Sequence, residues 1–205
     1  VVSGNVSFYN ETKKKNIYPT PVIGGVGLIK KLSKPLNHYF KGHNNKLILI
    51  GKTFGHLEQS CFLKENYSID VGMPPEINLL NEKNNGESLL KLIEKNLVLS
   101  SHDISNGGLI TALSEMALNS NFGAKIQKPK KLTNLIKYFF GEDQARYIIE
   151  IDTNKLSQVE KILKDSEIFY ENIGRTQKEF FEIEGELKIS TKDLFEVNNK
   201  WYNNY

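Results

Sequence analysis

The feature that most constrains the fold is a stretch in the middle of the chain, residues 96–118, with the sequence NLVLSSHDISNGGLITALSEMAL. An apolar run at residues 97–99 leads into a small polar loop at residues 100–108, and apolar residues then recur at helical spacing from Leu109. This pattern predicts a strand, a glycine loop and a helix in direct succession. The rest of the chain is organised around this unit.

The glycine loop has two interpretations. The N–H groups at a helix start are unpaired and the helix dipole is positive there, so Asn106, Gly107 and Gly108 would let a phosphate group come close. Alternatively, Ser105 or Asn106 only caps the helix, and the two glycines only form a tight turn. Spacing alone favours the second interpretation, because a lone glycine loop is a weak signal of phosphate binding.

Strand and helix patterns alternate along the chain from residue 46 onwards. Residues 46–51 form a continuous apolar run, which is typical of a strand that is buried on both faces. The other predicted strands are residues 124–126, 145–151, 168–173, 180–183 and 187–189. The predicted helices are residues 57–64, 76–94 (as two helices or one broken helix), 132–139 and 155–164, with a last helix that starts at residues 190–193 and is packed down by Trp201 and Tyr202. This interleaving predicts an α+β fold, a layered sheet with helices on it.

The first part of the chain reads as a piece of another domain. Residues 1–9 and the glycine-rich residues 22–29 have strand patterns, and the basic residues 13–15 lie in a polar hairpin tip between them. Because residues 1–9 have no start signal before them, we expect them to come from the middle of a larger fold and to self-associate through an exposed strand edge. The polar connection at residues 30–45 is the predicted boundary. The predicted domains are residues 1–30 and residues 31–205.

Composition excludes several classes of function. The 27 Lys and Arg residues against 24 Asp and Glu residues give a mild formal net charge of +3, without a basic stripe that carries aromatic residues, so nucleic-acid binding is not predicted. No apolar stretch is long enough to span a membrane and no leader pattern opens the chain, which predicts a soluble, cytoplasmic protein without a membrane partner. The single cysteine, Cys61, predicts neither an internal disulfide nor a structural zinc site.

Near the start of the chain, Gly4, Asn5 and Ser7 form a candidate binding cluster. Alternate residues of a strand point to the same face, so the amide of Asn5 and the hydroxyl of Ser7 would lie side by side. Such oxygen atoms suit a magnesium ion and a polar substrate. From the residues alone, a solvent-exposed polar strand face is the favoured alternative.

Two further clusters have ordinary structural explanations. His102, beside Asp103, would need a partner and a substrate within reach to act as a base, and a loop histidine bonded to the backbone is the favoured interpretation. The charged residues of FGEDQARY, at residues 140–147, end a helix and start a strand. We expect Arg146 to pair with Glu142 at the surface, where such a pair contributes little to stability.

Four motifs together resemble a known family. SGNVSFYNET, YPTPVIGGVGLI, SHDISNGGL running into ALSEMA, and FGEDQARY occur in this order between residues 3 and 147. They resemble the C-terminal part of the large subunit of phosphoribosylformylglycinamidine synthases, which are related to aminoimidazole ribonucleotide synthetase, selenophosphate synthetase and thiamine-monophosphate kinase. The resemblance implies a mixed sheet with helices, as in the C-terminal domain of aminoimidazole ribonucleotide synthetase, preceded by strands of an incomplete N-terminal-type, ATP-binding domain.

The resemblance also implies a ligase reaction of purine biosynthesis. Formylglycinamide ribonucleotide, ATP and ammonia derived from glutamine would give formylglycinamidine ribonucleotide, ADP and phosphate, with magnesium present. Carried over to this chain, Gly4 would contact ATP through its backbone, Asn5 would ligate magnesium and Ser7 would touch the substrate. The implied partners are the N-terminal half of the same synthase, a glutaminase subunit and a small bridging subunit. The family's catalytic histidine lies in the missing half, so no catalytic residue is expected here.

The sequence departs from the family at residues 55–63, GHLEQSCFL, which lack the family's paired glycines. This departure puts in doubt any ligand contact by that loop. Ser105, Asn106, Gly107 and Gly108 resemble an auxiliary, non-turnover nucleotide site. An alternative function follows, a non-catalytic module that binds this auxiliary nucleotide and docks the glutaminase or the bridging subunit. A related ATP-using synthetase of the same superfamily is a weaker third possibility.

Overall fold

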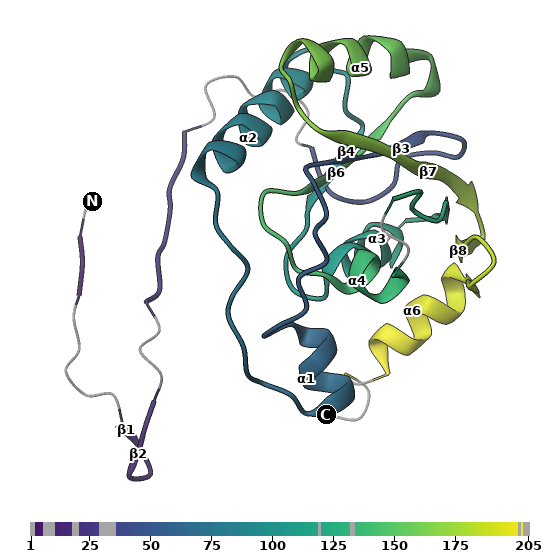
Figure 1. Ribbon diagram of the computed structural model, residues 1–205. Helices are drawn as coiled ribbons and strands as arrows, with labels where there is room; N and C mark the ends of the chain where they lie inside the picture. The colour runs from purple at the N-terminus through teal and green to yellow at the C-terminus, as the bar shows by residue number, and fades with distance from the viewer. Residues whose placement is uncertain are drawn as a thin grey trace. The chain divides into compact units, whose positions relative to one another are not determined.

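The computed structural model of the chain (Figure 1) describes residues 3–5, 11–17, 21–28, 36–118, 120–131, 134–200 and 202. The chain divides into two units, residues 1–35 and residues 36–205. This division falls within the predicted connection of residues 30–45, and the assignment of residues 1–30 to a separate domain type stays a prediction. No helix within the described ranges is long and apolar enough to cross a membrane.

Within its described residues, the second unit contains a seven-stranded sheet with the strand order β4-β6-β3-β7-β5-β8-β9. All neighbouring strands run antiparallel except β5 and β8, which are parallel, so the sheet is mixed as predicted. The strands are β3 (Lys46–Ile50), β4 (Ser100–Asp103), β5 (Phe122–Ile126), β6 (Tyr147–Ile151), β7 (Tyr170–Lys178), β8 (Phe180–Ile183) and β9 (Leu187–Ser190).

Helices cover both faces of this sheet (Figure 1). They are α1 (Cys61–Tyr67), α2 (Leu79–Glu94), α3 (Gly108–Leu118), α4 (Leu135–Phe140), α5 (Leu156–Asp165) and α6 (Thr191–Asn199), with a 3₁₀ turn at Thr153–Lys155. The α2 and α5 helices bury their apolar residues in one cluster, and α3 and α4, with Leu194 of α6, pack in the other. The predicted α+β class is therefore confirmed.

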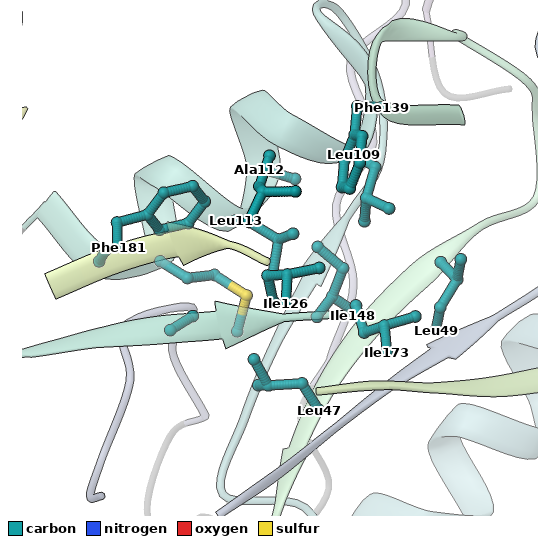
Figure 2. Packing of buried hydrophobic residues seen from close by; sticks show 14 of the residues in the cluster. Leu47, Leu49, Leu109, Ala112, Leu113, Ile126, Phe139, Ile148, Ile173 and Phe181 are labelled. Atoms are coloured by element: carbon teal, nitrogen blue, oxygen red, sulfur yellow. The ribbon is translucent and has the colours of Figure 1, made fainter. Parts of the chain in front are cut away.

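The central strand β3 explains how one short segment serves two cores. Leu47 and Leu49 point into the α3 cluster, while Ile48 and Ile50 point into the α2 and α5 cluster, and all four are fully buried. Figure 2 shows the two leucines of β3 among residues such as Leu109. Full burial of such a side chain contributes roughly 1.5–3 kcal/mol, so this strand, predicted to be buried on both faces, anchors both layers.

The strand beside the glycine loop is displaced from its predicted position. We expected residues 97–99 to form it, but the ladder is made by Ser100–Asp103. Leu97 and Val98 are buried before the strand starts and pack in the α2 and α5 cluster. Ser100 is fully buried, and its hydroxyl donates to Glu150 of β6 at 2.7 Å. Because Glu150 on the neighbouring strand β6 accepts this hydrogen bond, the polar Ser100 can occupy a buried position in β4.

Predicted helix limits shifted where side chains cap or tether the backbone. The interrupted helix of residues 76–94 is one helix, because Asn85 is buried within it and its side-chain amide donates to the Ala145 carbonyl at 2.8 Å. The helix expected at residues 57–64 begins at Cys61, where Ser60 caps the first turn. The last helix begins as predicted, with the Ser190 hydroxyl accepting from the Asp193 N–H at 3.0 Å. Tyr202 is 70% exposed and Trp201 lies outside the described residues, so their packing against this helix stays a prediction.

The first unit confirms the predicted hairpin tip and corrects the strands around it. The hairpin is formed by β1 (Glu11–Thr12) and β2 (Lys15–Asn16), and Lys13 and Lys14 between them have positive φ angles of 51° and 64°. Residues 21–28 form neither a strand nor a helix, and Val22 and Val26 are 94% and 104% exposed. An apolar strand pattern needs a paired backbone to become a strand, and no described part of the chain pairs with these residues.

The predicted strand at residues 1–9 is described only at residues 3–5. These three residues are exposed and form no strand, so the prediction is wrong at these positions. The other residues of this stretch lie outside the described part of the chain. The predicted self-association through this edge stays a prediction.

Candidate functional site

The segment between α4 and β6, residues 141–146, joins two loops that are distant in the sequence. These loops are residues 53–61, which lead from β3 into α1, and residues 105–108, which lead from β4 into α3. Two carboxylates and one guanidinium of the segment, from Glu142, Asp143 and Arg146, make the connections. We call this arrangement the loop junction.

The carboxylate of Asp143 is held by three consecutive backbone N–H groups. Its oxygens accept from Phe54 at 3.0 Å, Gly55 at 2.9 Å and His56 at 3.1 Å, and the residue is only 5% exposed. Successive N–H groups that converge in this way form an anion-binding concavity. In this protein the anion is the chain's own aspartate, which fixes the shape of the loop after β3.

Glu142 connects two helix starts. One of its oxygens accepts from the Cys61 N–H at 2.8 Å, at the first residue of α1, and from the Gly107 N–H at 2.7 Å, just before α3. A negative charge is stabilising at both places, because unpaired N–H groups and the positive helix dipole meet there. Burial and the neighbouring Glu142 carboxylate raise the pKa of the Cys61 thiol.

Arg146 is buried at the centre of the junction, with 1% of its surface exposed. Its guanidinium donates to the carbonyls of Asp143 and Gly141, at 3.1 and 2.6 Å, and to the hydroxyl of Thr53 at 3.1 Å. It lies 3.9 Å from the Asp143 carboxylate. Burial lowers the pKa of Arg146, while the charge of Asp143 acts in the opposite direction. The predicted surface pair of Arg146 with Glu142 is therefore wrong. Arg146 is buried and donates to Gly141, Asp143 and Thr53, while Glu142 accepts from the N–H groups of Cys61 and Gly107.

The four predicted phosphate-binding residues divide into two kinds. Ser105 and Asn106 are exposed, whereas Gly107 and Gly108 are buried with φ angles of +79° and +72°. A Cβ on Gly108 would lie 2.7 Å from the Gly141 carbonyl oxygen. Both glycines are thus favoured by the left-handed backbone of the turn, Gly107 also by the close approach of the Thr111 side chain and Gly108 by that of the end of α4, whatever the loop binds. A phosphate role for these residues stays a prediction, and such a group would meet a Gly107 N–H that already donates to Glu142.

Substituting alanine for Gly108 will lower the free energy of unfolding by about 2–3 kcal/mol, because the left-handed backbone and the contact with α4 both disfavour a side chain. Urea denaturation measures this loss. Gly86→Ala is the matched control, since its Cβ would meet only the Tyr147 hydroxyl at 3.7 Å within α2. We expect the control to be neutral or to stabilise by about 0.5–1 kcal/mol. Equal stability of the two variants would contradict this explanation of the loop.

His102 lies on β4 and pairs with carboxylates rather than with the backbone, so the predicted backbone bond is wrong. Its Nε2 is 2.9 Å from the Glu115 carboxylate on α3, and its Nδ1 is 3.3 Å from Asp103. The ring of His38 lies 5.1 Å away, centre to centre. Burial, and next the charge of His102, lower the pKa of His38. Helix periodicity alone did not indicate that Glu115 would reach β4.

The predicted residues of the first unit are described in part. Gly4 and Asn5 are exposed, and Ser7 lies outside the described residues. Within the ranges that the structure describes, no group of three or more His, Cys, Asp or Glu side chains is placed to hold a metal ion. The loop junction was not predicted from the sequence, where its only signal is an acidic pair, Glu142 and Asp143, followed by Arg146 directly after a helix.

Comparison with known proteins gives a consistent result. Residues 42–184 match the model of the AIR synthase related protein, C-terminal domain. The chain is 48% identical, over all its 205 residues, to the phosphoribosylformylglycinamidine synthase subunit PurL of Pelagibacter ubique, and it spans 28% of that relative's length.

Two solved structures from Thermotoga maritima share the fold. PurL complexed with FGAR has a TM-score of 0.64 at 17% identity, with 78% of this chain and 29% of that chain covered. The structure of PurLQS has a TM-score of 0.59 at 19% identity, with 78% of this chain and 27% of that chain covered. The family model covers most of the chain, and strands β3 to β8 of the mixed sheet and the glycine loop lie within the matched residues. The chain therefore belongs to the family of AIR synthase related proteins, whose C-terminal domain it contains.

Proposed function

We propose that the chain is the C-terminal part of a phosphoribosylformylglycinamidine synthase. The complete enzyme would use ATP and ammonia from glutamine to convert formylglycinamide ribonucleotide into formylglycinamidine ribonucleotide, ADP and phosphate. The observation that carries this proposal is the 48% identity to a PurL subunit over all 205 residues of the chain. The chain spans 28% of that subunit's length. Because the chain spans so little of that relative, the activity belongs to the complete synthase.

Within this function, the first unit supplies contacts to ATP, magnesium and substrate. Gly4 is exposed, and no described residue other than its chain neighbours lies within 4 Å of where its Cβ would be, which leaves room for a phosphate group beside its backbone. The exposed amide of Asn5 fits one oxygen ligand of a magnesium ion, which usually keeps waters and binds phosphate as well. Bound magnesium would offset the negative charge of the transferring phosphoryl group. Ser7 would touch the substrate.

An apolar surface of the second unit supports assembly with the rest of the synthase. Ile69, Val71, Met73 and Ile77 are 40–72% exposed along the segment between α1 and α2. The backbone of this segment is tethered by polar side chains: the Met73 N–H donates to Glu58 at 2.7 Å, and its carbonyl lies 2.8 Å from the Nε2 atom of His56. Tethering the backbone leaves the apolar side chains outward, and such exposed patches mark interaction sites. The proposed partners are the N-terminal half, a glutaminase subunit and a small bridging subunit.

The test joins the chain to the missing part of the enzyme. Combined with the remaining portion of the Pelagibacter ubique PurL, we expect it to restore ADP release that depends on formylglycinamide ribonucleotide and ammonia. Asn5→Ala should lower the rate at least ten-fold at limiting magnesium and less at saturating magnesium. Asn16→Ala, at the exposed hairpin, should leave the rate unchanged.

The two parts of the proposal fail separately. If the combined protein releases no ADP in response to the substrate, the synthase assignment is wrong. If the combined protein is active and the Asn5 variant is as active as wild type at every magnesium concentration, Asn5 is not a magnesium ligand.

A further inference from the structure

Three cations face one another across three neighbouring strands of the sheet. In the ladder, Arg175 of β7 is the direct partner of Lys46 on β3 and also of Lys125 on β5. We call these three residues the cationic row. Like charges at directly opposite positions destabilise a sheet, so such a row requires compensation.

A bulge in β7 places the row on one face. The register between β3 and β7 shifts between Leu47 and Ile48, and Gly174 next to the shift has a φ of +151°. A Cβ on Gly174 would lie 2.1 Å from the Lys125 carbonyl oxygen, so the backbones are in close contact there. Leu47 and the neighbours of Lys125 point into the α3 cluster, and therefore Lys46 and Lys125 point to the opposite face.

Compensation within the protein reaches only one end of the row. The Lys125 ammonium lies 3.1 Å from the Glu182 carboxylate and 3.6 Å from that of Glu184. In the part of the chain that the structure describes, the side chains of Lys46 and Arg175 form neither an ion pair nor a hydrogen bond. The positive charge is therefore concentrated at the β3 and β7 end of the row.

The row borders two adjoining hollows in the surface. One has a volume of about 310 Å³ and is lined by all three cations together with Gln127, Asn172, Gly174 and the acidic Glu184. The second, of about 420 Å³, shares Lys46 and Arg175 with the first and adds five polar residues, His43, Asn44, Asn45, Asp152 and Thr153, so that one carboxylate, that of Asp152, also lines it. Volumes of roughly 300–1,000 Å³ are typical of small-molecule sites, and the lining offers amide donors beside the charges.

The cationic row and the glycine loop lie at opposite ends of the central strands. Ile50, Tyr147 and Asp103 are aligned at the end of the sheet where the chain continues into residues 104–108. Lys46 aligns with Ile151 at the other end of the same ladder. Any ligand of the cationic row is thus separate from the predicted auxiliary phosphate residues.

We propose that the cationic row binds the phosphate group of a small phosphorylated ligand. The planar guanidinium of Arg175 can donate two parallel hydrogen bonds to phosphate oxygens, and the flexible ammonium of Lys46 adds a point charge beside it. Bound phosphate would supply the compensation that Lys46 and Arg175 lack within the described chain.

Isothermal titration of the 205-residue chain with inorganic pyrophosphate and with ADP tests this site. Both ligands are expected to bind the wild-type chain. Arg175→Gln should weaken the affinity for both ligands at least ten-fold, and Arg175→Lys should have affinities between those of wild type and those of the Arg175→Gln variant. Lys192→Gln is the matched control, because this lysine is 83% exposed on α6 and the same charge is removed. We expect its affinities to equal those of wild type. Thermal melts of each variant establish that the fold is retained.

Three outcomes would overturn the proposal: no binding of either ligand, equal binding by the Arg175→Gln variant, or the same weakening in the Lys192 control. Adenosine without phosphate should not bind, and Arg175-dependent binding of adenosine would show that charge is not what the site recognises. If a glutamate-rich peptide binds through Arg175 while pyrophosphate and ADP do not, the row docks an acidic protein segment and the phosphate proposal is wrong.

Discussion

Replacement of Arg146 by methionine will lower the free energy of unfolding by about 3–5 kcal/mol, the range for removing one partner of a buried ion pair. The methionine keeps much of the volume but leaves the carbonyls of Asp143 and Gly141 without their donor. It also leaves the Asp143 carboxylate without the cation that lies 3.9 Å away. Urea denaturation, analysed by linear extrapolation, measures the loss.

Two further variants separate the buried network from a general effect of charge. Lys83→Met removes an exposed lysine on α2, whose side chain is 68% exposed, and should change stability by less than about 0.5 kcal/mol. Combining Arg146→Met with Asp143→Asn should cost less than the two single changes together, because the two groups share one network. Strict additivity, or a loss no larger than that of the Lys83 control, would contradict the junction described here.

The second large effect is expected at Glu150, a fully buried carboxylate on β6. Its oxygens accept from the backbone N–H groups of Lys41 and Gly42, the side-chain amide of Asn45 and the hydroxyl of Ser100, at 2.6–3.2 Å. Glu150→Gln places an NH₂ group against some of these donors, so we expect a loss of about 2–3 kcal/mol. Thermal and urea denaturation measure it.

An exposed glutamate supplies the comparison for Glu150. Glu94→Gln at the end of α2 removes the same charge without a buried partner, and its effect should stay within about 0.5 kcal/mol. Hydrogen exchange provides a second measurement, because the N–H groups of Lys41 and Gly42 should lose protection in the Glu150 variant and keep it in the control. Unchanged protection of these two groups would show that the carboxylate does not hold this segment.

Helices, strands and turns whose sequence pattern depends only on neighbouring residues were predicted well. The apolar run at residues 46–51 indicated β3, and the 3.6-residue spacing after Leu109 indicated α3, because both describe how one element buries its own side chains. The hairpin tip near Lys13 followed from local turn chemistry in the same way. The apolar pattern at residues 22–29 predicted a strand that the described residues do not form, since an apolar strand forms only when another strand pairs with it.

The candidate site could be predicted only in outline. The sequence by itself determined a mixed α+β fold, the position of the glycine loop and the family to which the motifs belong. Only the tertiary structure decided that Glu142 and Asp143 serve different loops, that Arg146 is buried between them, and that Arg175 faces two lysines. The reason is physical: periodicity and caps are set within a few residues of the chain. The partner of a charge, and the register of a strand, are set by segments that meet only when the chain has folded.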